Sequence, residues 1–196
     1  MAKRLFDVVF SIFGLIVLSP VFIFISVFIL SDSKGGIFYR QRRVGKNNKD
    51  FSLIKFRTMV SGADRKGLLT IGDQDSRITK TGKWLRKYKL DELPQLFNIL
   101  KGEMSLVGPR PEVRKYVDLY TSDQMKVLSV RPGLTDYASL EYMNENEILM
   151  TYSDPEKAYI EKIMPEKLRL NMSYIKEQRM VTDLKIILKT LRKILA

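Results

Sequence analysis

The apolar segment from Leu5 to Leu30 constrains the fold most, because its only charged residue is Asp7. As one helix it would span roughly 39 Å, enough to cross the hydrocarbon core of a bilayer, which is about 30 Å thick. Ser19 and Pro20 lie near its middle. Because a proline removes one helical hydrogen bond and clashes with the preceding turn, the sequence predicts a helix that breaks at this pair.

Basic residues flank the apolar segment at both ends. Lys3 and Arg4 precede it, and four cations follow it: Lys34, Arg40, Arg42 and Arg43. Basic flanks prefer the cytoplasmic side of a membrane, and a re-entrant helix that enters and leaves by one face satisfies both ends. A kinked spanning helix and a buried core helix are the alternatives. We expect residues 1–33 to form the re-entrant membrane helix and residues 34–196 a cytosolic catalytic domain.

Composition limits the chemistry available to this chain. Its 196 residues suffice for one domain with a real core, and its net charge of +12 implies an anionic partner such as nucleic acid, acidic lipid or a phosphorylated substrate. It has no cysteine and no histidine, which excludes disulfides, thiolate or imidazole metal sites and histidine bases. A hard, oxygen-liganded cation such as Mg²⁺ is the compatible metal.

The rest of the chain predicts an α+β fold that is mainly helical. Residues 37–42 and 51–57 have strand patterns and are joined by turn residues, which predicts a β-hairpin. A long polar loop at 61–81 leads into a short helix at 81–88, whose Trp84 and Leu85 should face the core. We further expect helices at 112–120 and 122–129, a turn at 131–135 and mostly helical structure thereafter. The last helix, 181–196, is basic and amphipathic, so it suits either a membrane interface or the domain core.

Two adjacent carboxylates, Asp91 and Glu92, precede a short apolar helix that should start near Pro94 and end at Gly102. Acids are common at such a position for structural reasons alone. Eight cations lie within twenty residues of the pair: Arg77, Lys80, Lys83, Arg86, Lys87, Lys89, Lys101 and Arg110. Such a field should keep both acids ionised, which suits either holding a divalent metal or attacking an electrophile whose charge the cations offset.

Three cations are candidates for phosphate binding. Lys55 lies on the cationic face of the second strand, and Arg86 lies five residues before Asp91. Arg110 stands between Pro109 and Pro111, which would stiffen a loop that presents one guanidinium. A solvated edge-strand lysine and an ordinary proline-rich connector are the structural alternatives. Arg131 lies beside the predicted turn.

Taken together, these motifs resemble one family, the bacterial sugar transferases, which are small monotopic phosphoglycosyl transferases. The resemblance runs from Lys3 to about Gly133. It is carried by the following residues: Lys3-Arg4-x-Phe6-Asp7, Ser19-Pro20, Arg42, Gly45 and Phe51, Lys55-Phe56-Arg57-Thr58-Met59, Leu90-Asp91-Glu92-Leu93-Pro94-Gln95-Leu96, Lys101-Gly102-Glu103-Met104-Ser105, Gly108-Pro109-Arg110-Pro111 and Arg131-Pro132-Gly133.

The resemblance implies an enzyme that transfers a sugar phosphate from a UDP-sugar to undecaprenyl (polyprenol) phosphate at the cytoplasmic face of the bacterial inner membrane. UMP is released and a surface glycan such as an exopolysaccharide is begun. It implies that Asp91 is the nucleophile, through a covalent phosphosugar, and that Asp91 and Glu92 bind Mg²⁺. The resemblance also implies that four cations bind phosphate or substrate: Lys55, Arg86, Arg110 and Arg131. The rival hypotheses are direct transfer with Asp91 as base or metal ligand, and a membrane-anchored, non-enzymatic protein that binds acidic lipid or nucleic acid.

One departure from the family pattern follows Gly133. Many members continue with Leu or Ile, Thr and Gly, whereas here Leu134 and Thr135 are followed by Asp136. The loss of a glycine and the gain of an acid affect the segment expected to recognise the sugar. The identity of the donor sugar is therefore left open.

Overall fold

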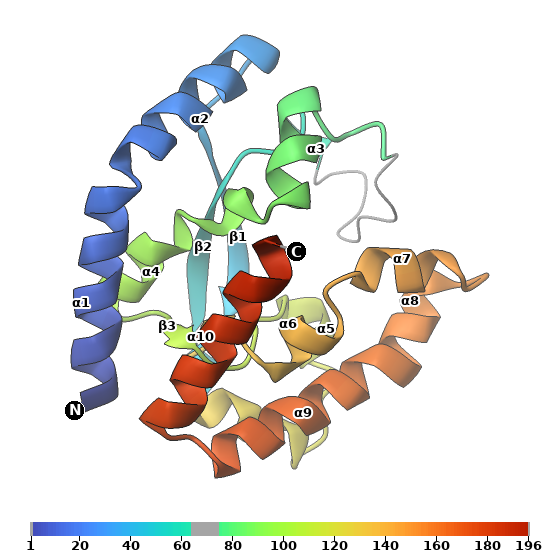
Figure 1. Cartoon of the computed structure of the whole chain (residues 1–196). Helices are drawn as coiled ribbons and strands as arrows, with labels where there is room; N and C mark the ends of the chain where they lie inside the picture. Colours follow the sequence, from blue (N-terminus) through green and yellow to red (C-terminus); the bar gives the residue numbers. More distant parts are fainter. Residues whose placement is uncertain (1, 64–74, 196) are drawn as a thin grey trace.

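The computed structural model describes residues 2–63 and 75–195, and these form a mainly helical protein with two small sheets (Figure 1). The helices are α1 (Ala2–Val17), α2 (Ser19–Asp32), α3 (Lys80–Lys87), α4 (Gln95–Lys101), α5 (Arg114–Val117), α6 (Tyr137–Glu141), α7 (Glu145–Met150), α8 (Pro155–Ala158), α9 (Met164–Lys176) and α10 (Met180–Leu195). The strands are β1 (Phe38–Val44), β2 (Asp50–Phe56), β3 (Ser105–Val107) and β4 (Gly133–Thr135). The mainly helical fold with a small hairpin is confirmed.

Helices α1 and α2 form one bent pair, and the break lies at the predicted Ser19-Pro20. The two axes differ in direction by 61°. Pro20 stands in the first turn of α2, where its missing N–H needs no partner, and the Ser19 hydroxyl donates to the carbonyl of Ile16 at 2.8 Å. Among the described helices, none alone has the length and apolarity to cross a bilayer, whereas this bent pair has both when its two halves are taken together.

The bent pair lies along one edge of the molecule, and all other elements lie together on one side of the pair (Figure 1). On the inner side, Ile25 and Ile29 pack with Phe56 and Leu85. Nine large apolar residues of the pair are instead more than half exposed: Leu5, Val9, Phe13, Ile16, Val17, Ile23, Phe24, Val27 and Leu30. Soluble monomers rarely expose a contiguous apolar surface of this kind.

Polar residues at the start of α1 hold this helix to the core. Lys3 Nζ donates to the last carbonyl of β3 at 3.0 Å. The Arg4 guanidinium donates to two carbonyls in the last turn of α4, at 2.6 and 2.9 Å. The buried Asp7 carboxylate accepts a hydroxyl and a main-chain N–H from β3, at 3.1 and 3.0 Å. Lys3 and Arg4, which the sequence suggested as flanking charges, thus also bind the core backbone.

The far end of the pair is held in a similar way. The Asp32 carboxylate accepts the N–H of Thr81, at the start of α3, at 2.7 Å. Arg57, which follows β2, donates to the carbonyls of Ser33 and Lys34 at 2.7 and 2.6 Å. Both ends of the bent pair are therefore tied to the same compact body.

Strands β1 and β2 form the predicted antiparallel hairpin, with Phe38 opposite Phe56. The turn contains Asn47 and Asn48 at φ of 56° and 61°, a left-handed conformation that asparagine tolerates better than most residues. Strand β2 does not alternate strictly between buried and exposed residues, because Leu53 and Ile54 are both buried.

Strands β3 and β4 form a short parallel pair, with Ser105 opposite Gly133. The prediction of a turn over 131–135 is therefore wrong for residues 133–135. The pairing depends on close approach of two backbones: a Cβ at Gly133 would lie only 2.1 Å from the nitrogen of Gly108. Only glycine permits this contact.

Other expectations are corrected or divided by the structure. Trp84 was expected in the core but is 45% exposed, because its neighbour Leu85, which is fully buried, occupies the inward face of α3. The two helices expected at 112–120 and 122–129 shrink to α5 and a 3-10 turn, Gln124–Ser129. Of the loop predicted at 61–81, residues 64–74 lie outside the described part of the chain.

The last helix, α10, meets the core along one side and exposes apolar residues along another. Ile186 is buried against Val107 and Tyr174. Four apolar residues of α10 are exposed instead: Val181, Leu184, Leu188 and Leu191. The side with Ile186 thus suits packing on the domain core, and the side with the exposed apolar residues suits a membrane interface.

Candidate active site

Asp91 and Glu92 lie in a 3-10 turn, Leu90–Glu92, that joins α3 to α4. Lys89, with a left-handed φ of 55°, redirects the chain between α3 and this turn. Leu90 and Leu93 pack on the apolar cluster that also contains Ile25 and Ile29 of α2, and this packing fixes the position of the turn. The acids therefore lie just before α4, as predicted, with Pro94 preceding its first residue.

The Asp91 carboxylate is buried and lacks a hydrogen-bond partner among residues 2–63 and 75–195. Burial raises the pKa of Asp91, and the negative charge of Glu92 raises it further. Lys55, Arg86 and Lys89 oppose this shift, but the pKa remains above its ordinary value. The two acids therefore lie in different electrostatic surroundings, because burial moves the pKa of Asp91 upward.

Glu92 is the opposite case, because two cations bind it directly. Lys55 Nζ donates to Oε1 at 3.1 Å. Arg110 grips both oxygens, donating to Oε2 at 3.1 Å and to Oε1 through its second nitrogen. Although burial opposes ionisation, Arg110 and Lys55 hold the pKa of Glu92 well below its usual range. Burial lowers the pKa of Lys55, and Glu92 counteracts that shift. Three predicted site residues are thus brought into one cluster.

The two remaining predicted cations lie at different places. The charge of Arg86 lowers the pKa of Asp91, so this side chain belongs to the same site, where its Nε donates to the Thr58 hydroxyl at 2.9 Å. Arg131 Nε instead donates to the carbonyl of Gly102 at 2.8 Å. Gly102 lies at the opposite end of α4 from the acids, and seven helical residues span roughly 10 Å. Arg131 therefore does not join the acid pair.

The loop that presents Arg110 is held through its backbone. The carbonyl of Pro109 accepts the N–H of Gly133 at 3.0 Å. The carbonyl of Pro111 accepts from the Arg43 guanidinium at 3.1 Å. The N–H of Arg110 donates to the buried carboxylate of Asp136 at 2.9 Å. Sequence reasoning missed the contributions of Arg43 and Asp136; the only signal was that Asp136 departs from the family pattern.

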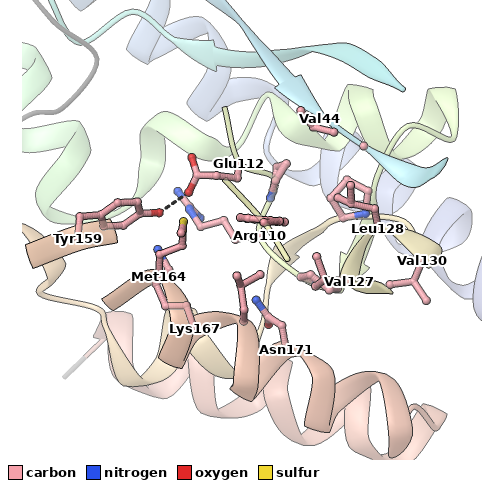
Figure 2. A pocket seen from close by; sticks show the side chains of 16 residues that line it. Val44, Arg110, Glu112, Val127, Leu128, Val130, Tyr159, Met164, Lys167 and Asn171 are labelled. Atoms are coloured by element: carbon pink, nitrogen blue, oxygen red, sulfur yellow. Dashed lines mark hydrogen bonds between the residues drawn. The ribbon is translucent and has the colours of Figure 1, made fainter. Parts of the chain in front are cut away.

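A small cavity lies beside this loop, and Figure 2 shows its lining residues. Glu112 accepts hydrogen bonds there from the Tyr159 hydroxyl and, at 3.0 Å, from Arg43. Asn171 Oδ1 is buried in the lining and has no hydrogen-bond partner within the described part of the chain. The cavity holds about 30 Å³, which is room for one or two water molecules. It is too small for a ligand of the size of a sugar nucleotide.

The acid pair has a donor set that fits magnesium only together with a substrate. Within the described residues no group of three or more potential ligand side chains gathers. Mg²⁺ is commonly held by one or two carboxylates plus substrate phosphates and water. Asp91 has unbonded oxygens that suit this role, whereas both oxygens of Glu92 are bound by Lys55 and Arg110. Glu92 would become a ligand only if these cations turned toward phosphate.

Comparison with known proteins adds independent information. A protein of Aeromonas hydrophila named UDP-N-acetylgalactosamine-undecaprenyl-phosphate N-acetylgalactosaminephosphotransferase is 36% identical over 98% of this chain. The Klebsiella pneumoniae UDP-glucose:undecaprenyl-phosphate glucose-1-phosphate transferase is 35% identical over 97% of it. The chain spans only 43% and 39% of these two proteins, but 87% of the uncharacterized sugar transferase EpsL of Bacillus subtilis, at 37% identity.

The family described as bacterial sugar transferase matches residues 1–196, so the match includes the bent helix pair, the acid pair, the Arg110 loop and α10. The relatives align over nearly all of the chain, and two of them are named for the transfer of sugar phosphates to undecaprenyl phosphate. We conclude that this chain belongs to the bacterial sugar transferase family.

Proposed function

We propose that this protein is a phosphoglycosyl transferase that moves a sugar phosphate from a UDP-sugar to undecaprenyl phosphate and releases UMP. The observation that carries the proposal is the contrast between the two acids. Asp91 is buried and unbonded, whereas the adjacent Glu92 is neutralised by Lys55 and Arg110. An unpartnered carboxylate beside paired cations is suited to attack a phosphate, because the cations can offset the charge of the electrophile.

In the first step, an Asp91 oxygen attacks the β-phosphorus of the UDP-sugar. The bond between this phosphorus and the bridging oxygen breaks, UMP leaves, and the sugar phosphate remains on Asp91. Lys55 and Arg110 would exchange Glu92 for donor phosphate oxygens, and Arg86 lies on the Asp91 side of the site. These cations reduce the repulsion between two anions that have to approach each other.

In the second step, a phosphate oxygen of undecaprenyl phosphate attacks the same phosphorus. The bond to Asp91 breaks, and the product is a polyprenol-diphosphate sugar. Splitting the transfer in two lets a soluble donor and a lipid acceptor use one small site in turn. A site beside the apolar bent pair suits a reaction in which a soluble donor binds first and a lipid acceptor second.

Magnesium is proposed as the metal of this site, held by Asp91 and, once its cations turn to phosphate, by Glu92. When bound with the donor it would supply positive charge to the diphosphate. Positive charge near Asp91 also favours the ionised carboxylate, which offsets the effect of burial on its pKa.

We also propose that the bent pair is a re-entrant membrane helix that places the site at the cytoplasmic face of the bacterial inner membrane. Its exposed apolar side chains favour lipid. Both of its ends are bonded to the same core, through Arg4 and Asp7 at one end and Asp32 at the other. A polar core that holds both ends keeps them on one side of the bilayer.

The test is UMP release in detergent or nanodiscs from a panel of UDP-sugars, with and without undecaprenyl phosphate and Mg²⁺. Wild-type protein should release UMP from at least one donor in a manner that depends on acceptor and metal. Asp91→Asn should reduce turnover by about 10³-fold or more while the protein still folds. Asp123→Asn, at an exposed surface pair, is the matched control and should retain wild-type activity.

The rival mechanisms predict different results in the same assay. A covalent route predicts a phosphosugar adduct on Asp91 by intact mass when acceptor is withheld. A turning-over enzyme that never accumulates or traps this adduct would support direct transfer, with Asp91 as base or metal ligand. A folded protein that releases no UMP from any donor, yet binds anionic vesicles or nucleic acid in a salt-dependent manner, would support the non-enzymatic hypothesis.

A further inference from the structure

Asp136 is a fully buried acid, and both of its oxygens bind main-chain N–H groups. Oδ1 accepts from Ser139 at 2.6 Å and thereby caps the start of α6. Oδ2 accepts from Arg110 at 2.9 Å. The same carboxylate therefore joins a helix start to the loop that carries a cation of the active site.

The hydrogen bond from the Arg110 N–H to Asp136 is significant because the two neighbouring residues have no main-chain N–H. Pro109 and Pro111 have no N–H, so Arg110 is the sole main-chain donor of this three-residue stretch. The side of the loop facing the small cavity is incompletely packed, since Pro109, Arg110 and Pro111 all line that space (Figure 2). A loop with one donor and open space beside it depends on the acceptor that binds this donor.

The guanidinium of the same residue grips Glu92. Arg110 thus lies between two carboxylates, Glu92 at its side chain and Asp136 at its backbone, and both charges raise the pKa of Arg110. A shift or rotation of the Arg110 backbone would move the guanidinium away from Glu92.

We propose that Asp136 is a positioning residue of the transferase, which sets the Arg110 guanidinium on Glu92 by binding the Arg110 backbone N–H. This inference rests on the proposed function for its effect on activity, but its structural content is independent of that function.

The main variant is Asp136→Asn, which keeps the side-chain size and an oxygen able to cap α6. Its second position is an NH₂ group, which cannot accept from the Arg110 N–H. Asp136→Ser serves as the second variant, because serine also caps helices but is too short to bind both N–H groups. The matched control is Asp154→Asn, since Asp154 caps α8 in the same way, at 3.0 Å, without contact to Arg110.

The first measurement is hydrogen exchange by NMR in the full-length protein, which needs no substrate. Arg110 supplies the only exchanging main-chain amide between Gly108 and Glu112. We expect Asp136→Asn to accelerate exchange at this amide by about tenfold or more and Asp154→Asn to leave it unchanged. Unchanged protection of Arg110 in a folded Asp136→Asn or Asp136→Ser protein would overturn the inference, whatever the protein catalyses.

The second measurement is kcat/KM for the donor sugar nucleotide. Asp136→Asn should lower it by about tenfold or more, whereas Asp154→Asn should stay within about twofold of wild type. In an Arg110→Lys background the same substitution should add less than about twofold, because two residues that act through one group are not additive. Losses that multiply in that background would show that Asp136 acts elsewhere and would overturn the proposal. If wild-type protein releases no UMP, the proposed function fails, and hydrogen exchange alone decides the role of Asp136.

Discussion

At the scale of single residues, the site depends on how the neighbouring cations interact differently with two adjacent acids. Glu92 takes both nearby cations as hydrogen-bonding partners, while Asp91 is influenced by Lys55, Arg86 and Lys89 only through space. The sequence suggested the acids and most of the cations, but not that the pKa values of the two acids are shifted in opposite directions. The difference arises from burial and from hydrogen bonds that span 37 and 18 residues of chain, which no local pattern reveals.

The exposed Lys89 allows the electrostatics of Asp91 to be tested, because this lysine acts on the carboxylate through its charge. Its positive charge lowers the pKa of Asp91, so removal of that charge should raise this pKa. An acid that loses its proton at higher pH becomes an active nucleophile only at higher pH. Lys89→Asn should therefore move the acid limb of kcat/KM upward by a few tenths of a pH unit. Asparagine is chosen because it tolerates the left-handed φ of this position.

The control for this prediction is Lys101→Asn, which removes an exposed lysine from the last turn of α4, the end far from the acids. Its pH profile of kcat/KM should match that of wild type. A shift of the Lys89→Asn acid limb to lower pH would contradict the direction argued here.

At the scale of secondary-structure elements, the long elements were predicted well and the short ones poorly. The apolar run with its Ser19-Pro20 break and the hairpin contain enough residues for their patterns to repeat. Strands β3 and β4 have three residues each, shorter than any pattern that could identify them. Their pairing depends instead on the contact between Gly108 and Gly133, which are far apart in sequence, and so 131–135 resembled a turn.

The contact between these two glycines gives a stability prediction for the short parallel sheet. A methyl group at Gly133 would lie 2.1 Å from the nitrogen and 2.3 Å from the oxygen of Gly108, both backbone atoms that have little freedom to move. Gly133→Ala should destabilise the protein by about 3 kcal/mol or more, or prevent folding, as measured by thermal or denaturant unfolding. Gly36→Ala is the control, because the nearest atom to an added methyl group there is 3.8 Å away. Equal stability of the two variants would mean that β3 and β4 do not pair as described.

At the scale of the whole molecule, the bent pair and the core form one unit. Apolar packing through Ile25 and Ile29 lies between polar contacts at the two ends of the pair. The sequence predicted the break but not this attachment, because the partners of Lys3, Arg4 and Asp7 are about a hundred or more residues away. Hydropathy and flanking charge describe how a segment meets a membrane and contain no information on such contacts.

The topology proposed for the bent pair can be checked because the chain contains no cysteine. Single cysteines at Ala2 and Lys34, both exposed and at opposite ends of the pair, are unique labels. In right-side-out and inverted vesicles, both should react with an impermeant thiol reagent only from the cytoplasmic side. Labelling of the two positions from opposite sides of the membrane would exclude the re-entrant arrangement and leave a kinked spanning helix.

The polar contacts of Lys3, Arg4 and Asp7 at the start of α1 have a consequence for how the chain folds. Arg4 bonds to carbonyls 95 and 96 residues later, Asp7 to groups 98 and 99 residues later, and Lys3 to Asp183, 180 residues later. During synthesis, α1 is made before these partners, so its side chains lack them until roughly a hundred or more further residues have followed. Contacts of such sequence separation form slowly, because the intervening chain has to be ordered first. Helix α1 thus leaves the ribosome before the groups that bind it, and we expect its docking to complete folding of this core rather than to initiate it.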